Sequence, residues 1–118
     1  MVKPKSYSHD LLDNVEKELL FEGYLSGYRH YAEWDQEWEI MRHPLKLVRH
    51  STNPFDQHAI AVFADSKMIG YVPKSSSEKI SILIDKGASI YAELVDVFPN
   101  AETQKKVFFR IWNYKVTL

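Results

Sequence analysis

The sequence contains no cysteine and only four glycines in 118 residues. Without cysteine the chain forms no disulfide and offers no thiolate to a metal, which excludes thiolate zinc sites and is compatible with a reducing cytoplasm. No stretch approaches the roughly 20 apolar residues of a membrane span, and the start of the chain is not followed by the apolar core of a signal peptide. These absences predict a cytoplasmic protein that does not enter a membrane.

Neither sign of charge dominates the sequence. Fifteen Lys and Arg residues stand against sixteen Asp and Glu residues, which gives a formal net charge of −1. Such a chain lacks the positive field of proteins that coat long stretches of duplex, so any contact with nucleic acid must be local. The hydrophobic content of 45% and the aromatic content of 14% fit a single domain with a packed core.

The first third of the chain predicts an arm, a short helix and a strand. Residues 1–7 are expected to form a loose arm, and Ser8 or Asp10 can cap a short helix. The apolar residues of that helix follow helical spacing at Leu11, Leu12, Val15 and Leu19. We therefore expect residues 1–18 to form the arm and helix, and residues 19–118 to form one domain that begins with a strand over 19–27. Residues 28–42 fit either a loop or a bulged strand.

The rest of the chain predicts short strands and one further helix. Strands are expected over 45–50, 59–64, 68–72, 90–98 and 106–116, with the second and third forming a hairpin around Asp65-Ser66. Residues 51–56 predict a loop. A helix is expected from a serine cap at 75–77 to a left-handed stop at Gly87. About six strands with one or two helices predict a mostly β fold, a small OB-like or SH3-like antiparallel β-barrel.

Five segments of the sequence together form a specific pattern. They are Gly-Tyr-Arg-His-Tyr at 27–31, Leu-Val-Arg-His at 47–50, Asn-Pro-Phe-Asp at 53–56, Ala-Ile-Ala-Val at 59–62 and Ile-Gly-Tyr-Val-Pro at 69–73. In this order they resemble the HIRAN domain, over residues 21–95 or so. That domain occurs at the front of certain DNA-remodelling helicases and as small free-standing bacterial proteins. The resemblance implies an OB-like barrel that captures the 3′ end of single-stranded DNA, with a helicase or another DNA-processing protein as a possible partner.

The resemblance also assigns roles to individual residues. Asp56 is expected to accept a hydrogen bond from the terminal 3′-hydroxyl and to repel a phosphate at the same place. Phe55 and His30 are the expected base-stacking surfaces. His30 departs from the family, which more often has an aromatic such as Tyr there, and imidazole stacks more weakly. The structural alternative is that Asp56 only forms a turn, as Asp after Pro often does.

The remaining expected binding residues lie in the same matched segments. Arg29, Lys74 and the backbone around Tyr71 are expected to contact phosphates, and Asn53 either holds the loop or reaches the sugar. Tyr31 fits a core aromatic as well as a ligand contact. Gly70 lets the backbone pass close to a ligand or to a neighbouring strand, the latter being favoured.

Other functions fit the sequence less well. An aromatic surface around Tyr28, Trp34 and Trp38 would suit a protein-interaction domain, because such residues are common in interface hot spots. Four histidines lie in one half of the chain, at positions 30, 43, 50 and 58, but not at helical ligand spacing, so metal binding is disfavoured. A metal-dependent nuclease that uses Asp56 with Glu93 or Asp96 ranks last. No phosphate loop or nucleophile motif is present, so we expect neither an enzyme nor a cofactor.

Overall fold

The computed structural model describes residues 15–31 and 35–116. In these two segments the chain forms six strands, two α-helices and one short 3-10 helix, η1, over Thr103–Lys105. The strands make two antiparallel three-stranded sheets, ordered β1-β6-β5 and β2-β3-β4. The predicted mostly β, antiparallel fold class is confirmed, although the two sheets are not closed into a continuous barrel.

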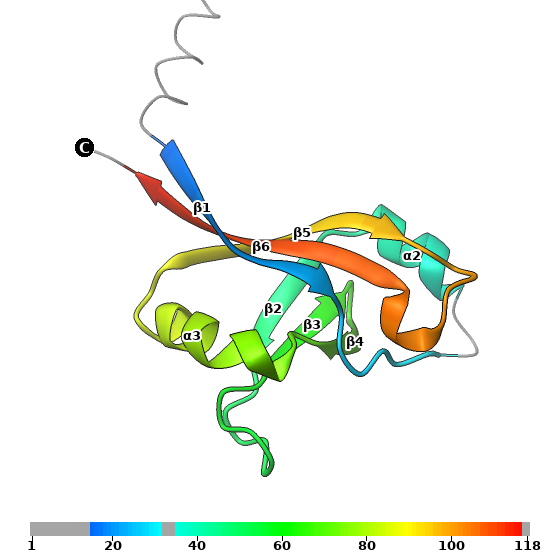
Figure 1. Ribbon diagram of the computed structural model, residues 1–118, viewed down its shortest axis with the longest axis horizontal. Coiled ribbons are helices and arrows are strands. Elements are labelled where there is room, and N and C mark those ends of the chain that lie inside the picture. The colour runs from blue at the N-terminus through cyan, green and yellow to red at the C-terminus, as the bar shows by residue number, and fades with distance from the viewer. Residues whose placement is uncertain (1–14, 32–34, 117–118) are drawn as a thin grey trace, which may run out of the picture.

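The first sheet contains the three long strands. They are β1 (Val15–Tyr24), β6 (Val107–Val116) and β5 (Ser89–Val97), which cross the upper part of Figure 1. Every second residue of β6 is buried, namely Val107, Phe109, Ile111 and Asn113. This alternation turns one face of the sheet toward the core, and each large apolar side chain buried there stabilises the fold by about 1.5–3 kcal/mol.

The second sheet contains the three short strands. They are β2 (Leu45–Arg49), β3 (Ile60–Ala64) and β4 (Lys67–Tyr71). The predicted hairpin is β3 and β4, and Asp65 in its turn has a positive φ of 56°. The inner face of this second sheet contributes Ile60, Val62 and Ile69 to the same core as Phe109. One hydrophobic core therefore lies between the two sheets.

The segment after β1 joins the two sheets. The amide of Leu25 donates to the carbonyl of Val107 at 3.0 Å, and Ser26 exchanges two backbone hydrogen bonds with Tyr71 at 2.9 and 2.8 Å. Gly70 permits this approach, because a Cβ at that position would lie 2.6 Å from the carbonyl oxygen of Ser26. The expected structural role of Gly70, close passage of a neighbouring strand, is confirmed.

The expected N-terminal helix is wrong at Val15, which lies in β1, whereas the strand expected from residue 19 is confirmed as the later part of β1. Val15 pairs with Val116 of β6, and Leu19, which also fitted the helical spacing, pairs with Trp112. Cross-strand contacts favour the strand: Lys17 Nζ lies 4.3 Å from the centre of the Trp112 ring, and Lys115 Nζ lies 3.4 Å from Glu18 Oε1. Tertiary pairing thus overrides the helical spacing of the leucines and Val15. The rest of that helix, including Leu11 and Leu12, and the arm over 1–7 lie outside the described residues.

A short helix, α2 (Gln36–Arg42), lies in the region 28–42, for which the sequence suggested a loop or a bulged strand. Its buried residues, Gln36 and Ile40, lie four positions apart on one side of the helix, and Ile40 belongs to the core. The Gln36 side chain accepts a hydrogen bond from the amide of Tyr31 at 2.8 Å and donates one to the carbonyl of Arg29. Gln36 therefore ties the helix to the irregular segment 29–31 that precedes it.

The predicted second helix is α3 (Lys74–Asp85), and Gly87 ends it with a φ of 86°. It begins earlier than expected, after Pro73, and no side chain caps it. The serines that were expected as caps lie instead within the first turn, and Ser77 is buried. In the described part of the chain, no helix combines the length and the apolar character that crossing a membrane requires.

Candidate nucleic-acid interface

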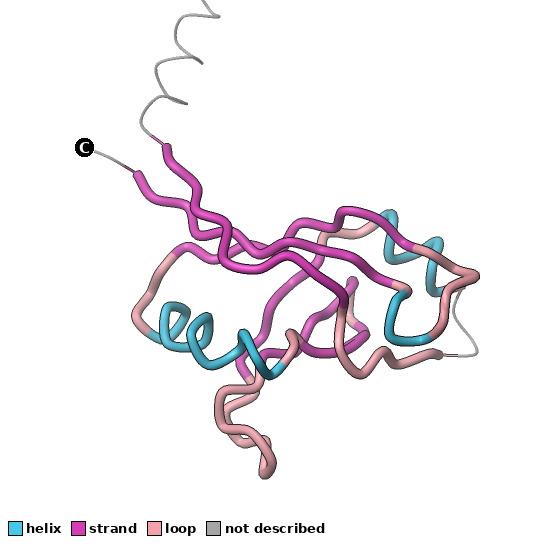
Figure 2. Tube along the Cα trace, viewed as in Figure 1, coloured by secondary structure: helices cyan, strands magenta, loops and turns pink. Residues whose placement is uncertain are grey.

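A cavity lies between the β2–β3 connection and the start of α3. The connection is the long loop that projects from β2 and β3 at the bottom of Figures 1 and 2. The cavity has a volume of about 230 Å³, and Ser26, Asn53, Phe55, Asp56, Ala59, Tyr71, Val72 and Lys74 line it. Five of the eight residues expected from the sequence to bind nucleic acid are therefore together at one cavity.

Asn53 shapes the tip of the loop. Its side-chain oxygen accepts hydrogen bonds from the amides of Phe55, at 2.8 Å, and of Asp56, at 3.2 Å. This local turn is the kind that Asn forms before Pro and Asp. The side chain of Phe55 consequently projects from the loop, with 88% of its surface exposed. Of the two roles expected for Asn53, the structure shows the loop-holding one.

The two carboxylate oxygens of Asp56 make different contacts. Oδ1 accepts a hydrogen bond from the amide of His58 at 2.9 Å, which is the turn-forming role. Oδ2 faces the hydroxyl of Ser77 at a long 3.5 Å. A good O–H···O hydrogen bond measures about 2.7–2.8 Å, so Oδ2 keeps most of its capacity as an acceptor. Asp56 thus forms the turn, and it is also one of the residues that line the cavity.

Helix α3 contacts the β2–β3 loop and the end of β2 through three residues spaced four apart. Ser77 faces Asp56, the hydroxyl of Ser81 lies 3.1 Å from His58 Nδ1, and Asp85 accepts from Arg49 Nε and Nη2 at 3.0 and 3.2 Å. The hydroxyl of Ser81 donates to the carbonyl of Glu78, so His58 Nδ1 is the donor in its contact with Ser81. The hydrogen bond from Arg49 lowers the pKa of Asp85.

Tyr71 forms the wall of the cavity opposite the loop tip. Its ring stacks on His50 with 6.2 Å between centroids and 8° between planes, and its hydroxyl lies 3.1 Å from His50 Nδ1. The backbone of Tyr71 is held on both sides, by Ala61 in β3 and by Ser26. An aromatic side chain fixed in this way presents a rigid surface to whatever occupies the cavity.

The other three expected residues do not line this cavity. Tyr31 donates from its hydroxyl to the carbonyl of Met68 at 2.8 Å, and Lys67 Nζ lies 4.8 Å from the centre of its ring. These contacts give Tyr31 a structural role against β4. Arg29 and His30 are exposed, and the amide of Arg29 donates to the carbonyl of Ile69.

The sequence did not indicate three of the lining residues. Ser26, Ala59 and Val72 line the cavity because the backbone brings them there. Ser26 arrives through its pairing with Tyr71, more than forty positions away in the chain. No local pattern around a serine signals such a contact.

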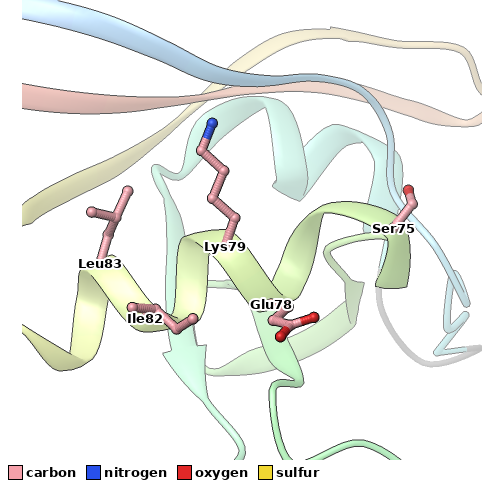
Figure 3. Close-up of a pocket in the computed structure, with 5 residues that line it drawn as sticks. All are labelled: Ser75, Glu78, Lys79, Ile82 and Leu83. Carbon is pink, nitrogen blue, oxygen red and sulfur yellow. The ribbon is translucent and has the colours of Figure 1, made fainter.

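A larger cavity, of about 440 Å³, lies against α3. Ser75, Glu78, Lys79, Ile82 and Leu83 line it. In Figure 3, the side chains of Lys79 and Leu83 extend to the side of α3 on which β1 and β6 pass. None of the eight expected binding residues lines it, and none of the described residues that line it carries an aromatic ring that could stack on a base. We therefore base the candidate site on the smaller cavity.

The aromatic surface of the alternative hypothesis is only partly described. The hydroxyl of Tyr28 donates to Glu37 Oε2 at 2.7 Å, whereas Trp38 on α2 is 55% exposed. Burial, and then the hydrogen bond to Glu37, raise the pKa of Tyr28. Trp34 lies outside the described residues. Within residues 15–31 and 35–116, no three His, Cys, Asp or Glu side chains gather as metal ligands.

The raised pKa of Tyr28 predicts a pH dependence of stability. In the unfolded chain tyrosine ionises near pH 10, whereas the folded chain keeps Tyr28 neutral to higher pH. Above about pH 10 the unfolded state binds fewer protons than the folded state, so the free energy of unfolding falls as the pH rises. Urea unfolding between about pH 9 and pH 11 should show a shallower fall for Tyr28→Phe than for the wild type. Tyr24→Phe, which removes an exposed tyrosine, should keep the wild-type slope, and equal slopes for all three proteins would contradict the assignment.

Comparison with known proteins identifies the family. The sequence matches no curated protein. A crystal structure of a protein from Lactobacillus plantarum shares the fold with a TM-score of 0.64 and 19% identity, covering 86% of this chain and 98% of that chain. The HIRAN domain of human HLTF shares it with a TM-score of 0.59 and 19% identity, covering 85% and 80%. A sequence model of the HIRAN domain matches residues 19–114. The chain therefore belongs to the HIRAN domain family, whose members are known in general as DNA-binding modules.

Proposed function

We propose that the cavity between the loop and α3 binds the last nucleotide of a single DNA strand that ends in a free 3′-hydroxyl. The observation that carries this proposal is the position of Phe55 and Asp56. Both lie at the tip of one loop, both line one cavity, and Asp56 keeps an oxygen that its neighbours occupy only weakly. Membership of a family of DNA-binding modules supports the same proposal.

The chemistry of a strand end matches the groups in the cavity. A terminal nucleotide offers a base with two exposed faces, and a ring such as Phe55 stacked on one of them contributes about 1–3 kcal/mol. The terminal hydroxyl is a donor, for which the carboxylate of Asp56 is a strong acceptor. Lys74 at the edge of the cavity is a suitable partner for the phosphate on the 5′ side.

The same groups disfavour an internal nucleotide. Inside a strand, the 3′ oxygen carries a phosphate instead of a proton, and that phosphate would lie next to the Asp56 carboxylate. Two negative charges at about 4 Å repel each other by about 1 kcal/mol in water and by more near a protein surface. At about 230 Å³ the cavity is also smaller than the roughly 300–1,000 Å³ of clefts that enclose whole ligands, so it suits a single partly enclosed nucleotide.

HIRAN is a binding domain rather than a catalytic one, and we propose a binding role without chemistry for this chain. A helicase or another DNA-processing protein as the partner, and a cytoplasmic location, belong to the same proposal. DNA cleavage that stops on chelation would contradict it, because a nuclease would then be present.

The state of the strand end tests the proposal directly. Fluorescence anisotropy with oligonucleotides labelled internally should show at least about tenfold weaker binding, or about 1.4 kcal/mol, when the 3′ end carries a phosphate. The same oligonucleotide with a 5′-phosphate has the same charge and should bind like the unmodified one. Equal affinity for the 3′-hydroxyl and 3′-phosphate ends would remove Asp56 from its proposed role.

Substitution of Asp56 by Asn tests the carboxylate itself. The amide oxygen can still accept from the amide of His58, so the loop keeps its turn, but the negative charge is lost. We expect Asp56→Asn to reduce the preference for the 3′-hydroxyl over the 3′-phosphate from about tenfold to nearly none. Asp65→Asn is the matched control, because Asp65 is an exposed acid at positive φ, where Asn is well tolerated. An unchanged preference in Asp56→Asn would contradict the proposal.

A further inference from the structure

Charge is distributed unequally between the two sheets. The sequences of β1, β5 and β6 contain five acids and three bases, whereas those of β2, β3 and β4 contain three bases and no acid. The three bases are Lys46, Arg49 and Lys67. The β3–β4 turn contains Asp65, at the end of the sheet away from Tyr71. A chain with a net charge near zero thus has one sheet that favours an anion locally.

The outer face of this sheet carries an apolar groove. The register places Val48 beside Ala61 and Tyr71, and Lys46 beside Phe63 and Met68. Alternate residues of a strand share a face, so all six lie on one side of the sheet, opposite the core residues Val62 and Leu45. A groove of about 180 Å³ follows this side, lined by Val48, Arg49, His50, Ala61, Phe63 and Met68.

The groove continues the candidate site. Tyr71 lines the cavity at the loop, His50 lines the groove, and the rings of these two residues stack in parallel and share a hydrogen bond. Arg49 is held by Asp85 and by the carbonyl of Ala59, so the backbone at the junction is fixed. A strand whose last nucleotide is in the cavity therefore needs to pass only this pair of rings to reach the groove.

We propose that the groove is a second nucleotide-binding site, which holds the bases that lie upstream of the 3′-terminal nucleotide. This inference rests on the proposed function and extends it from one nucleotide to a short strand. The floor of Phe63, Met68 and Val48 offers apolar contact to a base, and the exposed Lys46 beside it suits a phosphate. His30 lines neither the cavity nor the groove, so a strand that followed Arg29 and His30 instead would make different contacts.

Oligonucleotide length tests the second site. Wild-type affinity should rise from a single nucleotide, a nucleoside 5′-monophosphate, to a strand of about eight nucleotides, within the usual range for one OB fold. Val48→Glu places a negative charge in the groove at a side chain that is already 45% exposed. We expect it to weaken binding of the longer strand by about tenfold and to leave binding of the single nucleotide unchanged.

Val15→Glu is the matched control, because Val15 is a 41% exposed strand residue on the other sheet. It should change neither affinity. Urea unfolding of both variants checks that they fold. If Val48→Glu binds the longer strand like the wild type, or if it weakens binding of the single nucleotide equally, the second site is wrong.

The strand path can also be read by photo-cross-linking. A photoreactive base at the second or third position from the 3′ end should cross-link to His50, Phe63 or Met68. Cross-links confined to Arg29 and His30 would overturn the groove and leave the proposed function intact. Loss of the 3′-hydroxyl preference with retained cross-links to the groove would instead contradict the terminal site, so the two failures are distinguishable.

Discussion

Phe55→Ala is expected to weaken binding of a single strand with a 3′-hydroxyl by about 1–3 kcal/mol, or roughly 5- to 150-fold. The expected loss is large because the ring is 88% exposed in the free protein and gains its contacts only from a stacked base. The same exposure predicts that the free energy of unfolding changes by no more than about 0.5 kcal/mol. Anisotropy titration and urea unfolding measure the two quantities.

Trp38→Ala is the control for Phe55→Ala. Trp38 is also a large exposed aromatic, but it lies on α2, away from the cavity lining. We expect its removal to leave DNA binding unchanged. If Trp38→Ala weakens binding and Phe55→Ala does not, the aromatic surface around Tyr28 and Trp38 is the interface, and the loop is not.

Gly70→Ala is expected to destabilise the fold by about 1–3 kcal/mol, the usual cost of overpacking a filled site. The added Cβ would lie 2.6 Å from the carbonyl oxygen of Ser26 and 2.7 Å from Leu25 Cγ. The first of these atoms belongs to the backbone that joins the two sheets, so it cannot move without loosening that junction. The urea midpoint should fall without a change in the m-value.

Ser26→Ala is the control for Gly70→Ala, because it changes the same junction without adding an atom. It should leave the unfolding free energy within about 0.5 kcal/mol of the wild type. A Gly70→Ala protein as stable as the wild type would show that the backbone of Ser26 yields easily. The close approach would then not explain the glycine.

The sequence correctly predicted the elements whose backbone conformation depends on a few adjacent residues. The Asn-Pro-Phe-Asp loop, the hairpin around Asp65 and the helix that ends at Gly87 all form where expected. In each case a few adjacent residues restrict the backbone by themselves, through proline, positive φ or side-chain hydrogen bonds to nearby amides. The order of these elements, together with the motif residues, was enough to indicate the family.

The errors occurred where distant contacts decide the structure. Val15 and Leu19 have helical spacing but pair with β6, almost one hundred residues later. The α2 helix is short. Its two buried residues, Gln36 and Ile40, lie among acids and tryptophans, so the sequence does not mark them as the inner face of a helix. Neither outcome follows from propensity, because in both the partner comes from elsewhere in the chain.

The residues of the candidate site also fall into two groups, those that the local sequence predicts and those that distant contacts place. Asn53, Phe55 and Asp56 were recognisable because they form one turn, and the cavity contains all three. The matched segment at 27–31 belongs to the same resemblance, yet its main chain pairs with β4 and its side chains do not reach the cavity wall. A motif shows which residues occur together in sequence, whereas the sheet register decides which of them face the same space.

The attachment of the loop to α3 has a consequence for the kinetics of recognition. A free loop would have to be immobilised at every encounter, at a cost in conformational entropy that weakens binding. The contacts of Ser77 with Asp56 and of Ser81 with His58 hold the loop against α3, and Asp85 holds Arg49 at the end of β2. These contacts form when the domain folds, so the loop loses that conformational entropy before a ligand binds. The binding site should therefore be largely formed before a strand binds. Differences in affinity among strand ends should then appear mainly in the dissociation rate.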